Sequence, residues 1–96
     1  MSDVKRVFKW PVRVDDQDHP IGSGKVVHVA CQSGVVDVVQ VWTEETADTV
    51  GRMRRARVYG TGQPIAPADE HLGTALAPVH PPKTLVWHVY GGPRDE

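Results

Sequence analysis

Arg52, Arg54, Arg55 and Arg57 crowd into six residues and form the strongest local charge feature of this sequence. Guanidinium groups bind phosphate or carboxylate through paired hydrogen bonds, so such a cluster could mark an anion site. The preceding segment carries three carboxylates, those of Glu44, Glu45 and Asp48. Across a hairpin these carboxylates would neutralise much of the positive field, and salt would screen the rest. The pattern therefore favours a solvated face over an anion site.

Two glycine-containing segments invite comparison with nucleotide-binding loops. The run Gly-Ser-Gly-Lys at 22–25 lacks the earlier Gly of a phosphate-binding loop, because His19 stands there, and Val26 replaces the required Ser or Thr. The run Gly-Thr-Gly at 60–62 has Ile65 where a dinucleotide fingerprint needs its third Gly. Both segments are interpreted as connections between strands.

The five histidines and the single cysteine do not form a metal motif. Only His28 and Cys31 are close in sequence, and their odd separation places them on opposite faces of a strand. No set of Ser, His and Asp stands out as a catalytic group. We therefore expect no metal, no cofactor and no enzymatic activity. His88 lies between Val86 and Tyr90 on one side of a predicted strand, where its imidazole would need a hydrogen-bond partner.

The elements that would position these residues are strands. Seventeen valines stand against three leucines, and β-branched side chains favour sheet over helix. Alternation and turn residues predict strands at 7–14, 25–31, 35–43, 52–61, 73–77 and 84–90. The segments 15–24, 44–51 and 64–72 are predicted loops. We expect an all-β fold: a small antiparallel sandwich or partly open barrel of five to six short strands, with at most one short helical turn.

Three details of the arrangement follow from particular residues. Pro11 has no N–H to give, which predicts that the first strand lies at a sheet edge. Gln32, Ser33 and Gly34 form a short polar connection, so 25–31 and 35–43 are predicted to pair as a hairpin. The second arm of that hairpin is apolar on both sides, which is typical of a central strand.

Length and charge set the remaining bounds. With 96 residues and a formal net charge of −1, the chain is predicted to be a single domain at 1–96, with flexible tails at about 1–5 and 92–96. No apolar run is long enough to cross a membrane as a helix. A single cysteine and the lack of a signal-like N-terminus favour a cytoplasmic location.

Three segments resemble one known family. They are Tyr-Gly-Thr-Gly-Gln-Pro-Ile at 59–65, Leu-Gly-Thr at 72–74 and Leu-Val-Trp-His-Val-Tyr at 85–90, with an opening Phe-Lys-Trp-Pro at 8–11. Their order and spacing are similar to those of small uncharacterised proteins of tailed phages and bacteria. Gln63 departs from the His that is common at its position. The resemblance implies a phage or bacterial cytoplasmic setting and no activity.

These observations favour a non-enzymatic binding or accessory protein that presents an edge strand and the 60–72 loop to a protein partner. The alternative is a binder of a small anionic ligand or nucleotide that uses the Arg52 to Arg57 strand and the 60–63 loop. Its candidate residues are Arg55, Arg57, Tyr59, Thr61, Gln63 and His88. Nucleic-acid binding through the same arginines is a second alternative, which the overall charge makes unlikely. The edge at Pro11 allows a homo-oligomer.

Overall fold

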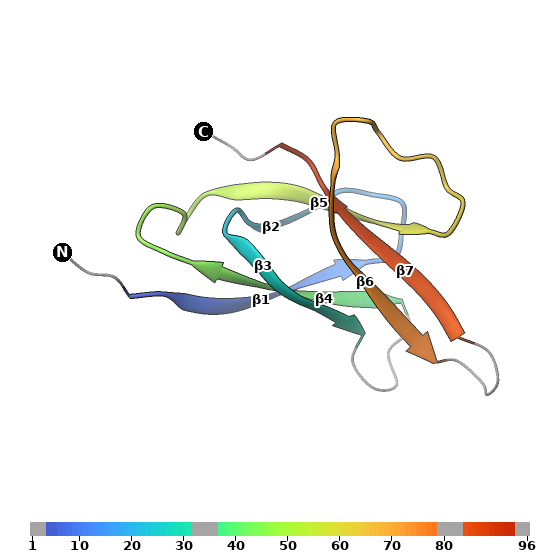
Figure 1. The fold of residues 1–96 in the computed structure, drawn as a ribbon, viewed down its shortest axis with the longest axis horizontal. Coiled ribbons are helices and arrows are strands. Elements are labelled where there is room, and N and C mark those ends of the chain that lie inside the picture. The colour runs from blue at the N-terminus through green and yellow to red at the C-terminus, as the bar shows by residue number, and fades with distance from the viewer. Residues whose placement is uncertain (1–3, 32–36, 79–83, 94–96) are drawn as a thin grey trace.

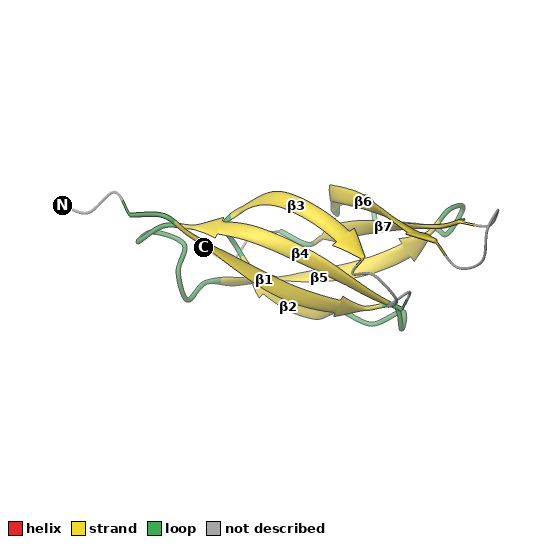
Figure 2. Cartoon of the chain, turned by 90° about the horizontal axis from the view of Figure 1, so that it is seen from below, coloured by secondary structure: helices red, strands yellow, loops and turns green. Residues whose placement is uncertain are grey.

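The fold is a sandwich of two antiparallel sheets (Figure 1). The computed structural model describes residues 4–31, 37–78 and 84–93. One sheet has three strands in the order β1-β4-β3 and the other has four in the order β2-β5-β7-β6. The strands are β1 (Arg6–Arg13), β2 (His19–Gly22), β3 (Lys25–Cys31), β4 (Val38–Glu45), β5 (Met53–Gly60), β6 (Glu70–Pro78) and β7 (Thr84–Gly91). Figure 2 shows these strands and no helix in the described part of the chain.

The alternating valines place the core between the sheets. Val12 of β1 and Val39 and Val41 of β4 are fully buried, and they meet Val58 and Val89 from the four-stranded sheet. Each of these positions is followed by a residue of the opposite face, because successive side chains of a strand point to opposite sides. The expected all-β sandwich is confirmed, with seven strands in place of five to six.

The hairpin and the edge strand are confirmed. β3 and β4 pair antiparallel, and β4 is the central strand of its sheet. β1 lies at the edge, as Pro11 predicted. The Val14 N–H donates to the Asp37 carbonyl at 2.9 Å, in the direction of β4. Because the backbone N–H groups of a strand point alternately to its two sides, the N–H that Pro11 lacks would have pointed to the free edge. The hairpin turn predicted at Gln32 to Gly34 falls outside the described residues.

All three predicted loops contain some strand, although in 44–51 this is only the end of β4 at Glu44 and Glu45. β2 lies inside 15–24, where Ile21 is fully buried although it is the only apolar residue of the segment besides Pro20. β6 begins at Glu70, inside 64–72, and is longer than the predicted 73–77. A bulge between His71 and Gly73 interrupts the alternation on which the prediction depended.

The connection between β5 and β6 positions one face of the molecule. Both strands run antiparallel to β7, so they are parallel to each other. Residues 61–69 must therefore return along the length of the sheet, and Figure 1 shows this return from the end of β5 to the start of β6. Asp69 ties the connection to Arg55 on β5. Tyr59 is only 8% exposed although it lies on the outer face of this sheet.

The two ends of the described chain differ in their contacts. Val4 and Lys5 are exposed, whereas the Gly92 N–H donates to the Arg55 carbonyl at 2.9 Å. Residues 1–3 and 94–96 fall outside the described part, so the flexibility of the tails stays a prediction.

Candidate functional site

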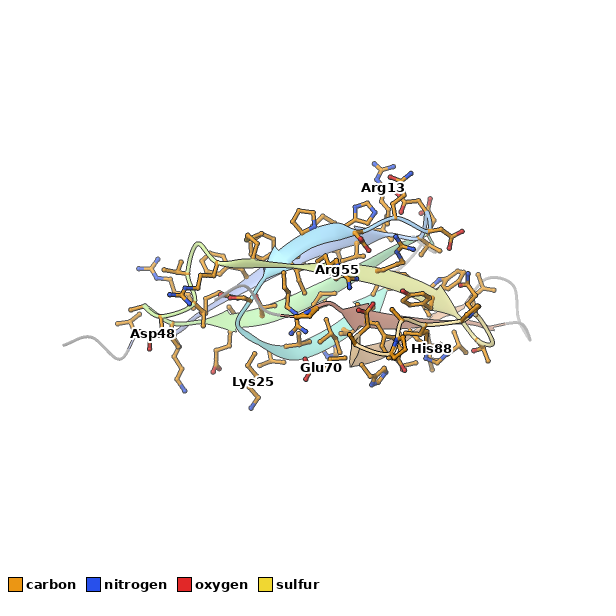
Figure 3. The ribbon with its side chains drawn as sticks, turned by 90° about the horizontal axis from the view of Figure 1, so that it is seen from above. Arg13, Lys25, Asp48, Arg55, Glu70 and His88 are labelled. Atoms are coloured by element: carbon orange, nitrogen blue, oxygen red, sulfur yellow. The ribbon has the colours of Figure 1, made fainter. Side chains whose placement is uncertain are left out.

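Five of the six candidate residues lie on the outer face of the four-stranded sheet, four of them on β5 and β7 and Thr61 directly after β5. Tyr59 of β5 pairs with His88 of β7, and Arg57 pairs with Tyr90, so these side chains share a face with Arg55. β6 adds side chains to the same surface through its pairing with β7. We call this surface the His88 face: Arg55, Arg57, Tyr59, Thr61, His71, Thr74, Leu76, Val86, His88 and Tyr90. Figure 3 shows Arg55 and His88 on it, on different strands.

His88 is at the centre of a hydrogen-bonded chain. Its Nε2 lies 3.0 Å from the Thr61 hydroxyl and its Nδ1 lies 3.2 Å from the Thr74 hydroxyl. The Thr74 hydroxyl is also 3.0 Å from His71 Nε2. Both ring nitrogens of His88 are therefore used, as a half-buried imidazole requires. The direction of each hydrogen bond depends on the histidine tautomers.

Tyr90 joins this chain to the rest of the face. Its ring meets that of Tyr59 edge-on, with centroids 5.8 Å apart, and that of His71 at 5.2 Å. Such edge-to-face contacts hold aromatic rings in fixed orientations. The rings of Tyr59, Tyr90 and His71 therefore form a continuous row across three strands, and the Thr74 hydroxyl joins His71 to His88.

Arg55 and Arg57 are neutralised by carboxylates. Arg55 donates two hydrogen bonds to Asp69, at 2.8 and 3.2 Å, and the first of these contacts is an ion pair with a fully buried carboxylate. Arg57 Nε donates to Asp18 at 3.0 Å. The hydrogen bond to Asp69 raises the pKa of Arg55. The prediction that Glu44, Glu45 and Asp48 would neutralise the cluster is wrong for these two arginines, because β4 and β5 belong to different sheets.

Arg54 does not belong to the solvated cluster that the sequence predicted. Arg54 points inward because successive side chains of a strand point to opposite faces, and Arg55 points outward. The Arg54 side chain is only 2% exposed. Its Nε and Nη2 donate to the Gly92 carbonyl at 3.0 and 2.7 Å, and Nη2 also contacts Glu70 at 2.9 Å. Arg54 therefore fastens the chain after β7 to the start of β6.

The predicted carboxylate partners have other roles. Glu44 lies 3.6 Å from the Lys5 ammonium. Glu45 is buried and accepts a hydrogen bond from the Gly24 N–H at 3.1 Å. The carboxylate can come this close because Gly22 and Gly24 have no side chains: a Cβ at either position would collide with it. Glu45 thus orders the turn between β2 and β3.

Gln63 braces the connection between β5 and β6 and takes no part in the histidine chain. Its Oε1 accepts a hydrogen bond from the Gly60 N–H, and its Nε2 lies 3.4 Å from Asp16. Thr61, two residues earlier, reaches His88. The structure therefore brings five candidates onto one face and leaves Gln63 at its border.

The functional groups on this face are the guanidinium, phenol, hydroxyl and imidazole groups of the residues named above. Among the described residues, no group of three or more His, Cys, Asp or Glu could hold a metal ion. His28 and Cys31 lie on opposite faces of β3, as predicted: His28 contacts Trp42, while Cys31 packs against the core.

A cavity of about 450 Å³ lies at the end of the His88 face that contains Arg55. Its other lining residues are Asp18, His19, Pro20, Met53, Arg54 and Pro93.

Five members of the face were not among the candidate residues: His71, Thr74, Leu76, Val86 and Tyr90. His71 was assigned to a loop, because the bulge beside it breaks the two-residue period. Tyr90 could have been placed on this face from the sequence, because it follows His88 by two residues in a predicted strand.

The comparisons with known proteins bear on family membership alone. No helix in the described part of the chain is long and apolar enough to span a bilayer. Neither a curated protein nor a solved structure matches the chain. One family model does match, over residues 3–96, and confirms the expected kinship with an uncharacterised family. The chain belongs to the family described as a domain of unknown function, DUF7352.

Proposed function

We propose that this protein is a non-enzymatic binding module that engages a protein partner through the His88 face. The observation that carries the proposal is an exposed apolar side chain beside a row of aromatic and imidazole rings. Leu76 is 63% exposed and pairs across the strands with Val86, beside the chain that joins His71, Thr74 and His88. Tyrosine, histidine and threonine side chains around an exposed aliphatic anchor are the composition of a protein-binding surface.

An anionic ligand fits this face less well. Arg55 and Arg57 already contact Asp69 and Asp18, so an incoming anion would have to displace a carboxylate from each guanidinium. The cavity at the Arg55 end includes Asp18 in its wall, which would repel an anion. The neutralised arginines support a structural role on β5.

The sheet edges are less suited to a partner than the face. β1 carries Pro11 and outward lysine and arginine side chains, and β3 and β6 each carry a bulge. β2 has four residues, one of them Pro20. These are the features by which natural sheets prevent the addition of another strand. We therefore propose that the partner binds to the face beside the 61–69 connection. The phage or bacterial cytoplasmic setting implied by the resemblance is part of the same proposal.

Site-specific photo-crosslinking in the native host tests this proposal. A benzophenone amino acid at Leu76 is expected to form a defined covalent adduct with one protein. The matched control is the same group at Val50, which is 57% exposed and lies in the turn between β4 and β5. The purified partner should then bind the unmodified chain.

The second measurement is the affinity of a variant that carries a charge in place of Leu76. Leu76→Asp should weaken binding of that partner at least about tenfold, because truncated or charged anchors lose most of the energy of an interface. Leu76 is exposed, so the variant should unfold at an unchanged temperature. Equal adducts from Leu76 and Val50, or full binding by Leu76→Asp, contradict the proposal. An adduct between two copies of this chain would show a homo-oligomer in place of a separate partner.

A further inference from the structure

The outer face of the three-stranded sheet collects cations around a tryptophan. Register places Lys9 of β1, Trp42 of β4 and His28 of β3 in one row across the sheet. On the same side, Lys25 lies in the next row beside Glu44, and Arg13 lies two rows away in the other direction, since facing residues of paired strands share a face. We call this surface the Trp42 face: Lys9, Arg13, Lys25, His28 and Trp42. Figure 3 shows Arg13 and Lys25 at separate places along the molecule.

These cations are not held by carboxylates in close ion pairs as the arginines of β5 are, although Asp15 interacts electrostatically with Arg13 over a longer distance. Lys9, Arg13 and Lys25 make no ion pair with any residue in the described part of the chain. Glu44, the carboxylate of this face, is the direct cross-strand neighbour of Lys25 and makes its ion pair with Lys5. The acidic side chains near β5, by contrast, each contact an arginine there. The net charge of −1 thus hides a basic surface on one sheet.

Trp42 gives this basic surface a flat aromatic centre. The Trp42 and His28 rings lie 5.1 Å apart at an angle of 50°, and the indole is partly exposed. Lys9 is its direct cross-strand neighbour on the other side. An aromatic ring on an exposed sheet, with cations beside it, is the arrangement that stacks one base and neutralises the adjoining phosphates.

Two of the cations stand in line on one strand. Lys9 and Arg13 stand four residues apart on the outward side of β1, which is a separation of about 13 Å in an extended strand. Lys25 lies across the sheet on β3, beyond Glu44. A flexible polyanion that follows β1 can meet Lys9 and Arg13 in turn while one of its bases reaches Trp42.

We propose that the Trp42 face binds single-stranded nucleic acid. This binding is independent of the protein partner placed on the opposite sheet. An acidic protein segment would use the same cations but would gain little from the Trp42 and His28 rings, so the aromatic pair favours a nucleic acid. The overall charge had made nucleic acid an unlikely partner, and the segregation of charge between the two sheets removes that argument.

Fluorescence anisotropy with a labelled 12-nucleotide oligothymidylate tests the proposal. Two phosphate contacts, at Lys9 and Arg13, predict that log K falls with log salt at a slope of about −1.4, or roughly 7-fold between 50 and 200 mM salt. Trp42→Ala should weaken binding roughly 5- to 150-fold, the range for loss of one stacked base. Trp42→Phe, which keeps an aromatic ring, should restore most of the affinity.

A matched pair of charge variants separates this face from charge in general. Lys9→Gln should weaken binding and make the salt slope shallower by about 0.7. Arg52→Gln removes the same charge from an exposed residue outside the face and should change neither. Thermal unfolding of Trp42→Ala checks that the variant folds, and Lys9→Gln provides a test that alters no packing.

Three results would overturn the proposal. The first is no binding of the oligonucleotide at 50 mM salt. The second is equal loss of binding in Lys9→Gln and Arg52→Gln, which would show an unspecific charge effect. The third is a poly-glutamate competitor that displaces the oligonucleotide at equal concentration while Trp42→Ala binds normally, which would identify an acidic protein as the ligand.

Discussion

Asp69→Asn should destabilise the fold by weakening the clamp between the 61–69 connection and β5. The Asp69 carboxylate is fully buried and accepts two hydrogen bonds from Arg55. Hydrogen bonds to charged groups each contribute about 1.5–3 kcal/mol, but the Arg55 side chain is 41% exposed, so water screens part of this. We expect a loss of about 1–2 kcal/mol, which lowers the melting temperature of a domain of this size by roughly 5–15 °C.

A double-mutant cycle of Arg55→Gln and Asp69→Asn, measured by urea unfolding, isolates the pair. Its coupling energy should be at least about 0.5 kcal/mol. Asp18→Asn is the comparison, because its contacts with Arg55 and Arg57 are exposed on both sides and should contribute about 0–1 kcal/mol. A coupling energy of zero, with both single variants as stable as the natural chain, would refute the structural role of these arginines.

Three further predictions concern other parts of the fold. Gly73→Ala should destabilise it by about 1–3 kcal/mol in urea, because the new Cβ would lie 2.5 Å from Val29 Cγ2; an unchanged midpoint would disprove the contact. The hydrogen bond from His19 lowers the pKa of the Asp15 carboxyl below 3.8, so the stability advantage over Asp15→Asn is present above the unfolded pKa and is lost as pH falls through the lowered one. Urea titrations at about pH 6 and pH 2 should show the difference and its loss, and a difference that persists in acid contradicts this link. Burial raises the pKa of the Cys31 thiol above 9.0, so iodoacetamide should modify it more slowly in the folded chain than in urea at about pH 8; equal rates would place the thiol in water.

The sequence predicts the fold well where the type of each side chain and its place in the two-residue alternation indicate the same face of a strand. In β1, Trp10 and Val12 alternate with outward residues, and the structure keeps that division. Pro11 identified the edge because a missing N–H has a direct consequence for pairing. The β3–β4 hairpin followed from two valine-rich arms on either side of a short polar segment.

The parts that sequence missed depend on contacts distant along the chain. Ile21 alone anchors β2, and four residues give too short a period to recognise. The bulge at His71 conceals the start of β6. The carboxylate that clamps Arg55 lies 14 residues away, at Asp69, and only the parallel arrangement of β5 and β6 brings the two together.

The candidate site was predictable in part for the same reason. Arg55, Arg57 and Tyr59 share a face by their two-residue spacing, which is visible in the sequence. That His88 pairs with Tyr59 depends on strand order, which the sequence left open. The hydroxyl that links His88 to His71 belongs to Thr74 on a third strand, so no local pattern could reveal it.

Hydrogen exchange on the complex tests most directly the claim that the His88 face is the binding surface. The chain should be measured alone and with the partner recovered by crosslinking from Leu76. The account predicts slower exchange in β6 and β7 on binding, with β1 and β4 unchanged. Slower exchange confined to β1 and β4, or none in β6 and β7, would contradict it.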